Sequence, residues 1–424
     1  MLKKFFAEYK KEDSLIRDSF LFFSASMILN LAGFFYHFYM GRVLGPAEYG
    51  ILGAMLSLLY VILVFFTVVQ TSVANVTARL YAKHTVSKVA YLLRNGSLWF
   101  AAGGGIGFLF YLFTSFFIPG LTKIPLWTYL SLSLAIPFIF LLPVGRGILQ
   151  GMQNFKHLSV NLIAEGIGKV VVGILLVAIG WGVTGAVLGI VFSFISAFAI
   201  AIISLRCLLR QRADAFALHL SDYFSSSVLA SLLILTLMYS IDVLLVRSYF
   251  DSVQAGYYAS ASLMGKIVFF ASLAITTVMF PKATALHASG KESKHILNKS
   301  LVLVFILIAG ALFSTIIFPR FIVLLLFGSE YLAITNILWI FCLVFSLFSL
   351  AYLLSMYNIS LNRSSFNYIL VSFLGLEILA ILLFHKSLEE VVFVLVGVMA
   401  ALFLSLLIYT FKHNAKTELS NTGL

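Results

Sequence analysis

The chain has 424 residues, of which 62% are apolar and only 10% charged, whereas an ordinary soluble domain carries about 25% charged residues. With a mean hydropathy of +1.07 and 42 phenylalanines, it would expose large aggregation-prone patches if water covered its whole surface. These values exclude a soluble globular protein and predict an all-α membrane protein.

Apolar segments long enough to cross a bilayer recur along the whole chain. A crossing takes about 20 apolar residues of helix. The first such segment is too long for the apolar region of a cleaved signal peptide, so we expect it to be retained. About twelve transmembrane helices are predicted, in chain order 15–39, 49–78, 92–118, 126–151, 157–179, 184–205, 221–247, 255–281, 297–318, 333–359, 366–384 and 391–411.

The basic residues between these spans predict the orientation. Short cytoplasmic loops retain Lys and Arg, and with the N-terminus inside, 21 of these residues fall in cytoplasmic segments and 5 in outer loops. Both termini are therefore predicted to be cytoplasmic in a cell membrane. Topology and attraction to anionic lipid headgroups account for the net charge of +12, so no nucleic-acid partner is predicted.

The two halves of the chain look related. The charged connection from Arg206 to Asp222 separates six spans from six, which predicts an N-terminal bundle over 1–210 and a C-terminal bundle over 211–424. The outer segments Arg42–Gly50 and Arg247–Gly256 each begin with Arg and end with Gly. A parallel repeat of two pseudo-symmetric six-helix bundles around a cavity is an architecture of alternating-access carriers, although a chance match of short loops also fits.

Ionisable side chains inside the spans are candidates for function, because a charge in hydrocarbon costs several kcal/mol. Glu165 and Lys169 share one helix face at spacing i, i+4, either as an internal ion pair or as part of a cavity. Lys266 lies near mid-depth and is the strongest candidate for a cavity cation. Glu377 is similarly deep and is either a proton site or paired with a neighbour.

A carboxylate and an imidazole occupy matching places in the two halves. Asp242 lies shortly before Arg247, and the repeat offset places His37 in the equivalent position of the first span. These groups could exchange protons during a transport cycle, since His titrates near neutral pH. The alternative is that both only reach the outer interface.

Motifs for catalysis or for tight cofactor binding are missing from the sequence. There is no HExxH, no GxxxxGK[ST], no CxxC and no serine elbow, and the inner loops are too short for a nucleotide-binding domain. Cys207 and Cys342 suggest neither a disulfide framework nor a metal site. We therefore predict no metal, no cofactor and no enzyme activity, with an intramembrane glycosyl or acyl transferase as the alternative.

Several stretches resemble one known family. GRVLGPAEYG at Gly41–Gly50 and RGILQGMQNF at Arg146–Phe155 are similar to segments of polysaccharide biosynthesis flippases, the Wzx-like branch of the multidrug, oligosaccharidyl-lipid and polysaccharide (MOP) transporter superfamily. Ile241–Val268 and Phe280–Leu286 look like later segments of that family, and the resemblance extends over essentially the whole chain. It implies a V-shaped pair of six-helix bundles, like that of MATE transporters.

The resemblance also implies a function. It is that of a carrier, acting as a monomer, that turns a polyprenyl-linked oligosaccharide from the cytoplasmic to the outer leaflet, coupled to H+ or Na+. Expected partners are membrane lipid and, beyond the substrate, glycosyltransferases or a polysaccharide polymerase. The runner-up is a cation-coupled multidrug exporter. By chemistry and depth, we assign the cationic passage to Lys266, Lys169, Arg42 and Arg247, and ion coupling to Asp242, His37, Glu165 and Glu377.

Overall fold

The computed structural model describes residues 2–83, 85–117, 123–216, 226–289 and 291–422. All regular secondary structure within these ranges is helical, which confirms the predicted all-α class. Two predicted boundaries lie outside the described residues, namely position 118 at the end of the third span and positions 221–225 at the start of the seventh.

Contacts divide the chain into two compact units. Unit 1 comprises residues 1–44 and 62–225, and unit 2 comprises residues 45–61 and 226–424. The helices that precede residue 217 are α1 (Leu2–Ala82), α2 (Val86–Phe117), α4 (Leu126–Ser133), α5 (Ile136–Gly151), α6 (Phe155–Leu176), η1 (Val177–Trp181), α7 (Gly182–Ser204) and α8 (Arg206–Leu209).

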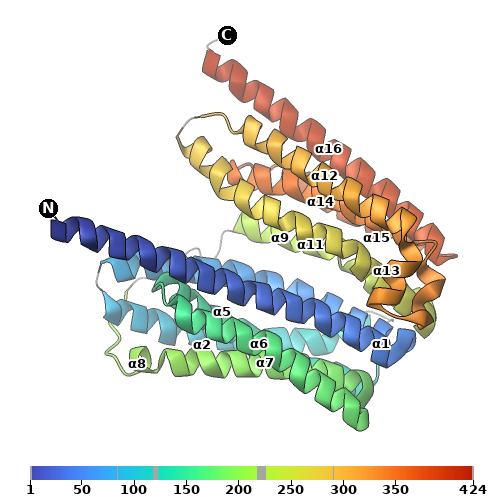
Figure 1. Ribbon diagram of the computed structural model, residues 1–424, viewed down its shortest axis with the longest axis horizontal. Coiled ribbons are helices and arrows are strands. Elements are labelled where there is room, and N and C mark those ends of the chain that lie inside the picture. Colours follow the sequence, from blue (N-terminus) through green and yellow to red (C-terminus); the bar gives the residue numbers. More distant parts are fainter. Residues whose placement is uncertain (1, 84, 118–122, 217–225, 290, 423–424) are drawn as a thin grey trace. The chain divides into compact units, whose positions relative to one another are not determined.

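From Ser226 onward, the chain lies entirely within unit 2. Figure 1 shows these helices in yellow-green to red. They are α9 (Ser226–Met238), α10 (Ile241–Tyr249), α11 (Ser252–Ala288), α12 (Lys294–Ile317), α13 (Pro319–Leu326), η3 (Ser329–Ile334), α14 (Leu338–Ser360), α15 (Asn367–Leu383) and α16 (Leu388–Thr422).

The helices agree with the predicted number of membrane crossings. Nine helical stretches in the described ranges are long and apolar enough to cross a membrane. Leu21–Ala82 has 62 residues and Phe155–Ser204 has 50, so each is long enough for two crossings of about 20 residues. Counting each of these twice and adding the shorter apolar helix Asn367–Leu383 gives the twelve expected spans.

Each long stretch changes direction at glycine. Gly45 interrupts α1 with φ 68° and ψ 174°, and Gly180 and Gly182 have φ 94° and 50° between α6 and α7. Positive φ is readily adopted by glycine because it has no Cβ. The chain therefore turns there with almost no loop, and α6 and α7 lie side by side (Figure 1).

The segment after Gly45 packs within unit 2, although a division at residue 210 was expected from the sequence. Tyr49 is buried and its ring lies 5.2 Å from that of Phe327. A Cβ built on Gly50 would lie 2.8 Å from the backbone N of Gly256, and one on Gly256 would lie 1.7 Å from the carbonyl O of Pro46. This backbone contact, which only glycine permits, places residues 45–61 with unit 2.

Two turns repeat almost identically in the two halves. Among the described residues, Gln153 and Asn362 are the only non-glycine residues with positive φ, 57° and 55°, and they are 209 positions apart. The N–H of Asn154 donates to the Leu149 carbonyl at 2.8 Å, and that of Arg363 to the Asn358 carbonyl at 3.0 Å. Both are Schellman motifs, which supports the predicted internal repeat.

Candidate functional site: two buried charge clusters

The first cluster lies in unit 1, around Arg146 of α5. Arg146 is only 4% exposed and forms an ion pair with Glu165 of α6, which is 15% exposed. Its Nε donates to Asn161 Oδ1 at 2.6 Å, and its guanidinium lies 5.5 Å from the ring centroid of Phe66 in α1. The cation on α5 thus contacts α6 and α1, and the carboxylate of Glu165 neutralises it.

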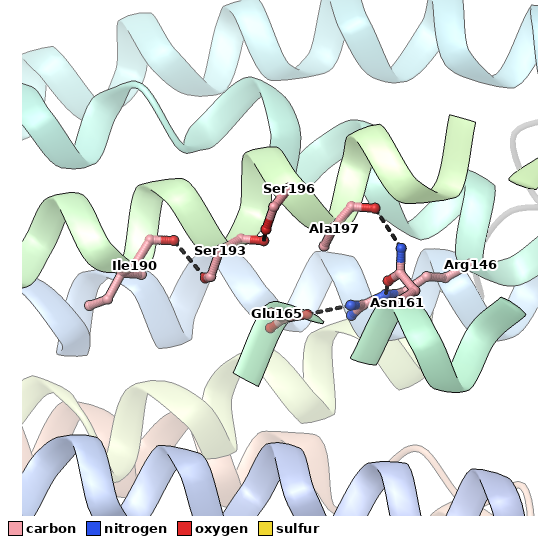
Figure 2. Close-up of polar contacts among 7 residues, drawn as sticks. All are labelled: Arg146, Asn161, Glu165, Ile190, Ser193, Ser196 and Ala197. Atoms are coloured by element: carbon pink, nitrogen blue, oxygen red, sulfur yellow. Dashed lines mark hydrogen bonds and ion pairs between the residues drawn. The ribbon is translucent and has the colours of Figure 1, made fainter. Parts of the chain in front are cut away.

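Asn161 extends this network to α7, as Figure 2 shows. Its Nδ2 donates to the Ala197 carbonyl at 2.5 Å, while Ser193 and Ser196 on the same helix donate back to carbonyls one turn earlier. Since a buried polar group without a partner is costly, the nearly complete satisfaction of this network favours a structural role for Arg146, Asn161 and Glu165.

The rest of the Arg146–Phe155 segment serves the packing of α5. A Cβ on Gly147 would lie 2.7 Å from the Gln70 carbonyl, and one on Gly151 would lie 2.5 Å from the Ala74 carbonyl, so α5 and α1 touch backbone to backbone. Gln150 accepts a 3.0 Å hydrogen bond from Gln70. This family-like motif therefore packs α5 closely against α1.

These contacts bear on two residues considered from the sequence. Arg146, counted among the basic residues at the cytoplasmic end of the fourth span, lies within α5 and is buried. The partner of Glu165 is Arg146, whereas Lys169 of α6 interacts with Glu165 only at longer range. The Lys169 ammonium instead lies 5.3 Å from the ring centroid of Tyr36, whose hydroxyl donates to the Ala186 carbonyl at 2.6 Å.

The other two unit 1 candidates lie along α1. His37 is half-buried, with its ring centroid 6.1 Å from that of Tyr36, and Arg42 is exposed one turn further on. With Glu165 paired to Arg146, the charges of Arg146, Glu165 and Lys169 sum to +1 when all are ionised. Because Arg146 and Glu165 neutralise each other, the remaining positive charge is that of Lys169.

The second cluster lies in unit 2 and joins three residues predicted separately. Asp242 of α10, Lys266 of α11 and Glu377 of α15 are 2%, 4% and 0% exposed, and they interact electrostatically with one another. The Lys266 ammonium lies 5.7 Å from the ring centroid of Tyr239 and 5.3 Å from that of Phe345. The Tyr258 hydroxyl donates to Asp242 Oδ2 at 3.0 Å.

The two clusters differ in how their carboxylates are paired. Glu165 of α6 forms an ion pair with Arg146. In unit 2, neither carboxylate oxygen of Glu377 has a hydrogen-bond partner in the described part of the chain.

Arg247 requires a further correction. The sequence suggested an outer loop, but the residue lies in the last turn of α10 and is 2% exposed. It is therefore part of α10 in unit 2 and not of the connection to α11. Asp251, which follows α10, instead caps α11 through hydrogen bonds from the N–H groups of Val253 and Gln254.

Three polar participants, Arg146, Asn161 and Tyr258, were missed by the sequence reasoning. Arg146 stands at the end of a predicted span, where positive charge is ordinarily explained by topology, and Tyr258 is one tyrosine among 19. The i, i+4 relation of Asn161 to Glu165 was a usable signal for the first. Nothing in the local sequence around Tyr258 indicates its bond to Asp242.

A sequence profile of the family described as "Polysaccharide biosynthesis protein" matches residues 39–336. No curated protein matches the chain significantly. The matched range begins just before Arg42 and ends after η3, so it contains Arg146, Asp242 and Lys266 but not Glu377.

Solved structures with a similar fold are MOP-superfamily transporters. An inward-facing multidrug resistance MATE transporter has a TM-score of 0.72 at 13% identity, covering 94% of this chain and 99% of its own. MATE in a bent conformation has a TM-score of 0.65 at 13% identity, covering 97% of each chain. A MOP transporter from Pyrococcus furiosus, whose title states a reversed polarity of its binding pocket, has a TM-score of 0.57 at 13% identity, covering 94% of each chain.

Proposed function

The chain belongs to the polysaccharide biosynthesis protein family, and on that premise we propose that it is a flippase for a polyprenyl-linked oligosaccharide. It moves this substrate from the cytoplasmic to the outer leaflet of the cell membrane by alternating access. The family membership carries the proposal, and the fold of MOP transporters is consistent with it. Both termini then face the cytoplasm.

The chemistry of such a substrate sets what the protein must supply. The sugars and phosphate groups are polar and anionic, so they need a hydrated, cationic passage through the bilayer, while the prenyl tail stays in hydrocarbon. Lys169 suits this role best, because Glu165 is already neutralised by Arg146 and the lysine is only half-buried. The exposed Arg42 on α1 is the second candidate.

Transport can be tested with vesicles that contain the purified protein and a fluorescent polyprenyl diphosphate disaccharide. A membrane-impermeant quencher reports the fraction of probe in the outer leaflet, and an imposed H+ or Na+ gradient should increase its transfer. Lys169→Met is expected to slow this transfer, whereas the exposed Lys386→Met should not. Equal rates in vesicles with and without protein would contradict the proposal.

The same vesicles separate the competing functions. Gradient-driven movement of ethidium, without movement of the disaccharide lipid, would identify a cation-coupled multidrug exporter. Two of the similar structures are named as multidrug resistance MATE family transporters. Formation of a longer glycan by detergent-solubilised protein would identify an intramembrane transferase. Movement of the disaccharide lipid with neither of these leaves the flippase as the explanation.

Coupling to the ion gradient is assigned to unit 2. Glu377→Gln is expected to abolish most of the gradient dependence of transfer while leaving the protein folded, because this carboxylate has no hydrogen-bond partner among the described residues to lose. Transfer down a substrate gradient should persist. Glu292→Gln, at an exposed carboxylate of the same unit, is the matched control, and an unchanged response of Glu377→Gln to the gradient would refute the assignment.

A further inference from the structure

Helix α11 presents a polar stripe to the interior of unit 2. Tyr258, Ser262 and Lys266 follow one another at intervals of four residues, which places them on one face of the helix, and all three are buried. Tyr258 binds Asp242, whereas Ser262 Oγ has no hydrogen-bond partner in the described ranges. Along the stripe, the tyrosine bound to the Asp242 carboxylate is followed by the Ser262 hydroxyl and then by the Lys266 ammonium group.

The charges around this stripe depend on Lys266. Two buried carboxylates, Asp242 and Glu377, interact with each other and with the lysine, and a buried charge without a counter-ion is strongly unfavourable. The aromatic rings of Tyr239 and Phe345 face the ammonium at distances typical of cation–π contacts. Carboxylate oxygens, a hydroxyl and aromatic faces bind a small monovalent metal ion as readily as they bind an ammonium group.

We propose that Lys266 is a built-in counter-ion, which occupies the place where a monovalent metal ion would otherwise neutralise Asp242 and Glu377. The side chain is therefore engaged inside unit 2 rather than in a passage for anionic substrate. Without the lysine, the two carboxylates leave a net charge of −2 inside unit 2 when both are ionised. A chain that lacks only this ammonium should acquire a site for Na+ or Li+.

This inference concerns cation binding and does not depend on the transported substrate. Only one consequence rests on the proposed function: if Na+ has no site in unit 2, H+ is the ion that drives transport through Glu377. Failure of the vesicle assay would overturn the flippase without affecting the counter-ion, and the binding experiment can fail while transport is intact.

The test is the thermal unfolding of purified Lys266→Met in detergent, with NaCl, LiCl or choline chloride at equal ionic strength. A ligand that binds only the folded state raises the melting temperature, so Na+ or Li+ should raise that of the variant by on the order of 3 °C or more. The wild type should show no difference between Na+ and choline. Adding Asp242→Asn and Glu377→Gln to Lys266→Met should remove the response.

Lys169→Met is the matched control, since it also removes a lysine beside an aromatic ring, but in a cluster whose carboxylate has Arg146 as partner. It should gain no Na+ response. A folded Lys266→Met that responds equally to Na+ and choline would overturn the proposal. If this variant does not fold in any of the salts, the wild type provides the test. A melting temperature of the wild type that depends on Na+ would contradict the proposal that Lys266 already fills the site. A melting temperature independent of Na+, together with normal folding of Lys266→Arg, would support the proposal.

Discussion

Arg146→Met is expected to destabilise unit 1 by about 3–5 kcal/mol, because removing one partner leaves a buried charge unpaired. The variant would lose the ion pair with Glu165 and the bond to Asn161 Oδ1. Methionine fills much of the same volume, so the lost charge rather than a cavity accounts for the effect. The expected observation is a large fall in the melting temperature of the purified protein in detergent.

A double-mutant cycle separates this interaction from general damage. In Arg146→Met/Glu165→Gln, both charges are absent, and much of the lost stability should return, since replacing a whole buried ion pair by neutral groups is often tolerated. Arg320→Met, at an exposed arginine of α13, should have little effect. A double variant no more stable than Arg146→Met would show that Glu165 is not the charge left uncompensated.

Gly256→Ala is expected to prevent folding of unit 2. The added Cβ would lie 1.7 Å from the carbonyl O of Pro46 and 2.4 Å from its carbonyl C, and neither atom can rotate away because both belong to the backbone. Overpacking of this kind costs typically 1–3 kcal/mol or more, and here the two segments must separate. We expect little monodisperse protein in detergent and none with the wild-type melting temperature.

Gly310→Ala provides the matched control. Gly310 lies inside α12, and a Cβ there would meet no atom within 4 Å. Alanine is favoured over glycine in a helix by about 1 kcal/mol, so this variant should be as stable as the wild type or slightly more stable. Wild-type behaviour of Gly256→Ala would mean that residues 45–61 do not pack against α11 as described.

The membrane spans were predictable because their signal is local. A run of about 20 apolar residues requires a helix in hydrocarbon, where every backbone polar group needs an internal partner. Positions such as Gly45 and Gly180 then determine where a long helix turns. The assignment of residues 45–61 to unit 2 was not predicted, because it depends on the contact between Gly50 and Gly256, which are 206 positions apart.

The candidate site was predicted as single residues rather than as clusters. Depth in a span identified Lys266, Glu377, Glu165 and Lys169 as costly charges, which is a property of each residue alone. Their pairing was beyond the same reasoning, since spacing along one helix suggested Glu165 with Lys169, while the nearer partner comes from α5. For Lys266, the carboxylates come from α10 and α15, which no local pattern connects to α11.

The amino-acid sequence by itself determined that this protein is helical, spans a membrane about twelve times and belongs with polysaccharide biosynthesis proteins, because composition, apolar length and short motifs are properties read along the chain. Only the tertiary structure decided which charges neutralise one another. Arg146 forms an ion pair with Glu165, whereas Glu377 has no hydrogen-bond partner among the described residues and interacts electrostatically with Lys266. The reason is physical: the energy of a buried charge depends on neighbours in space, and helix packing brings those neighbours from distant parts of the chain.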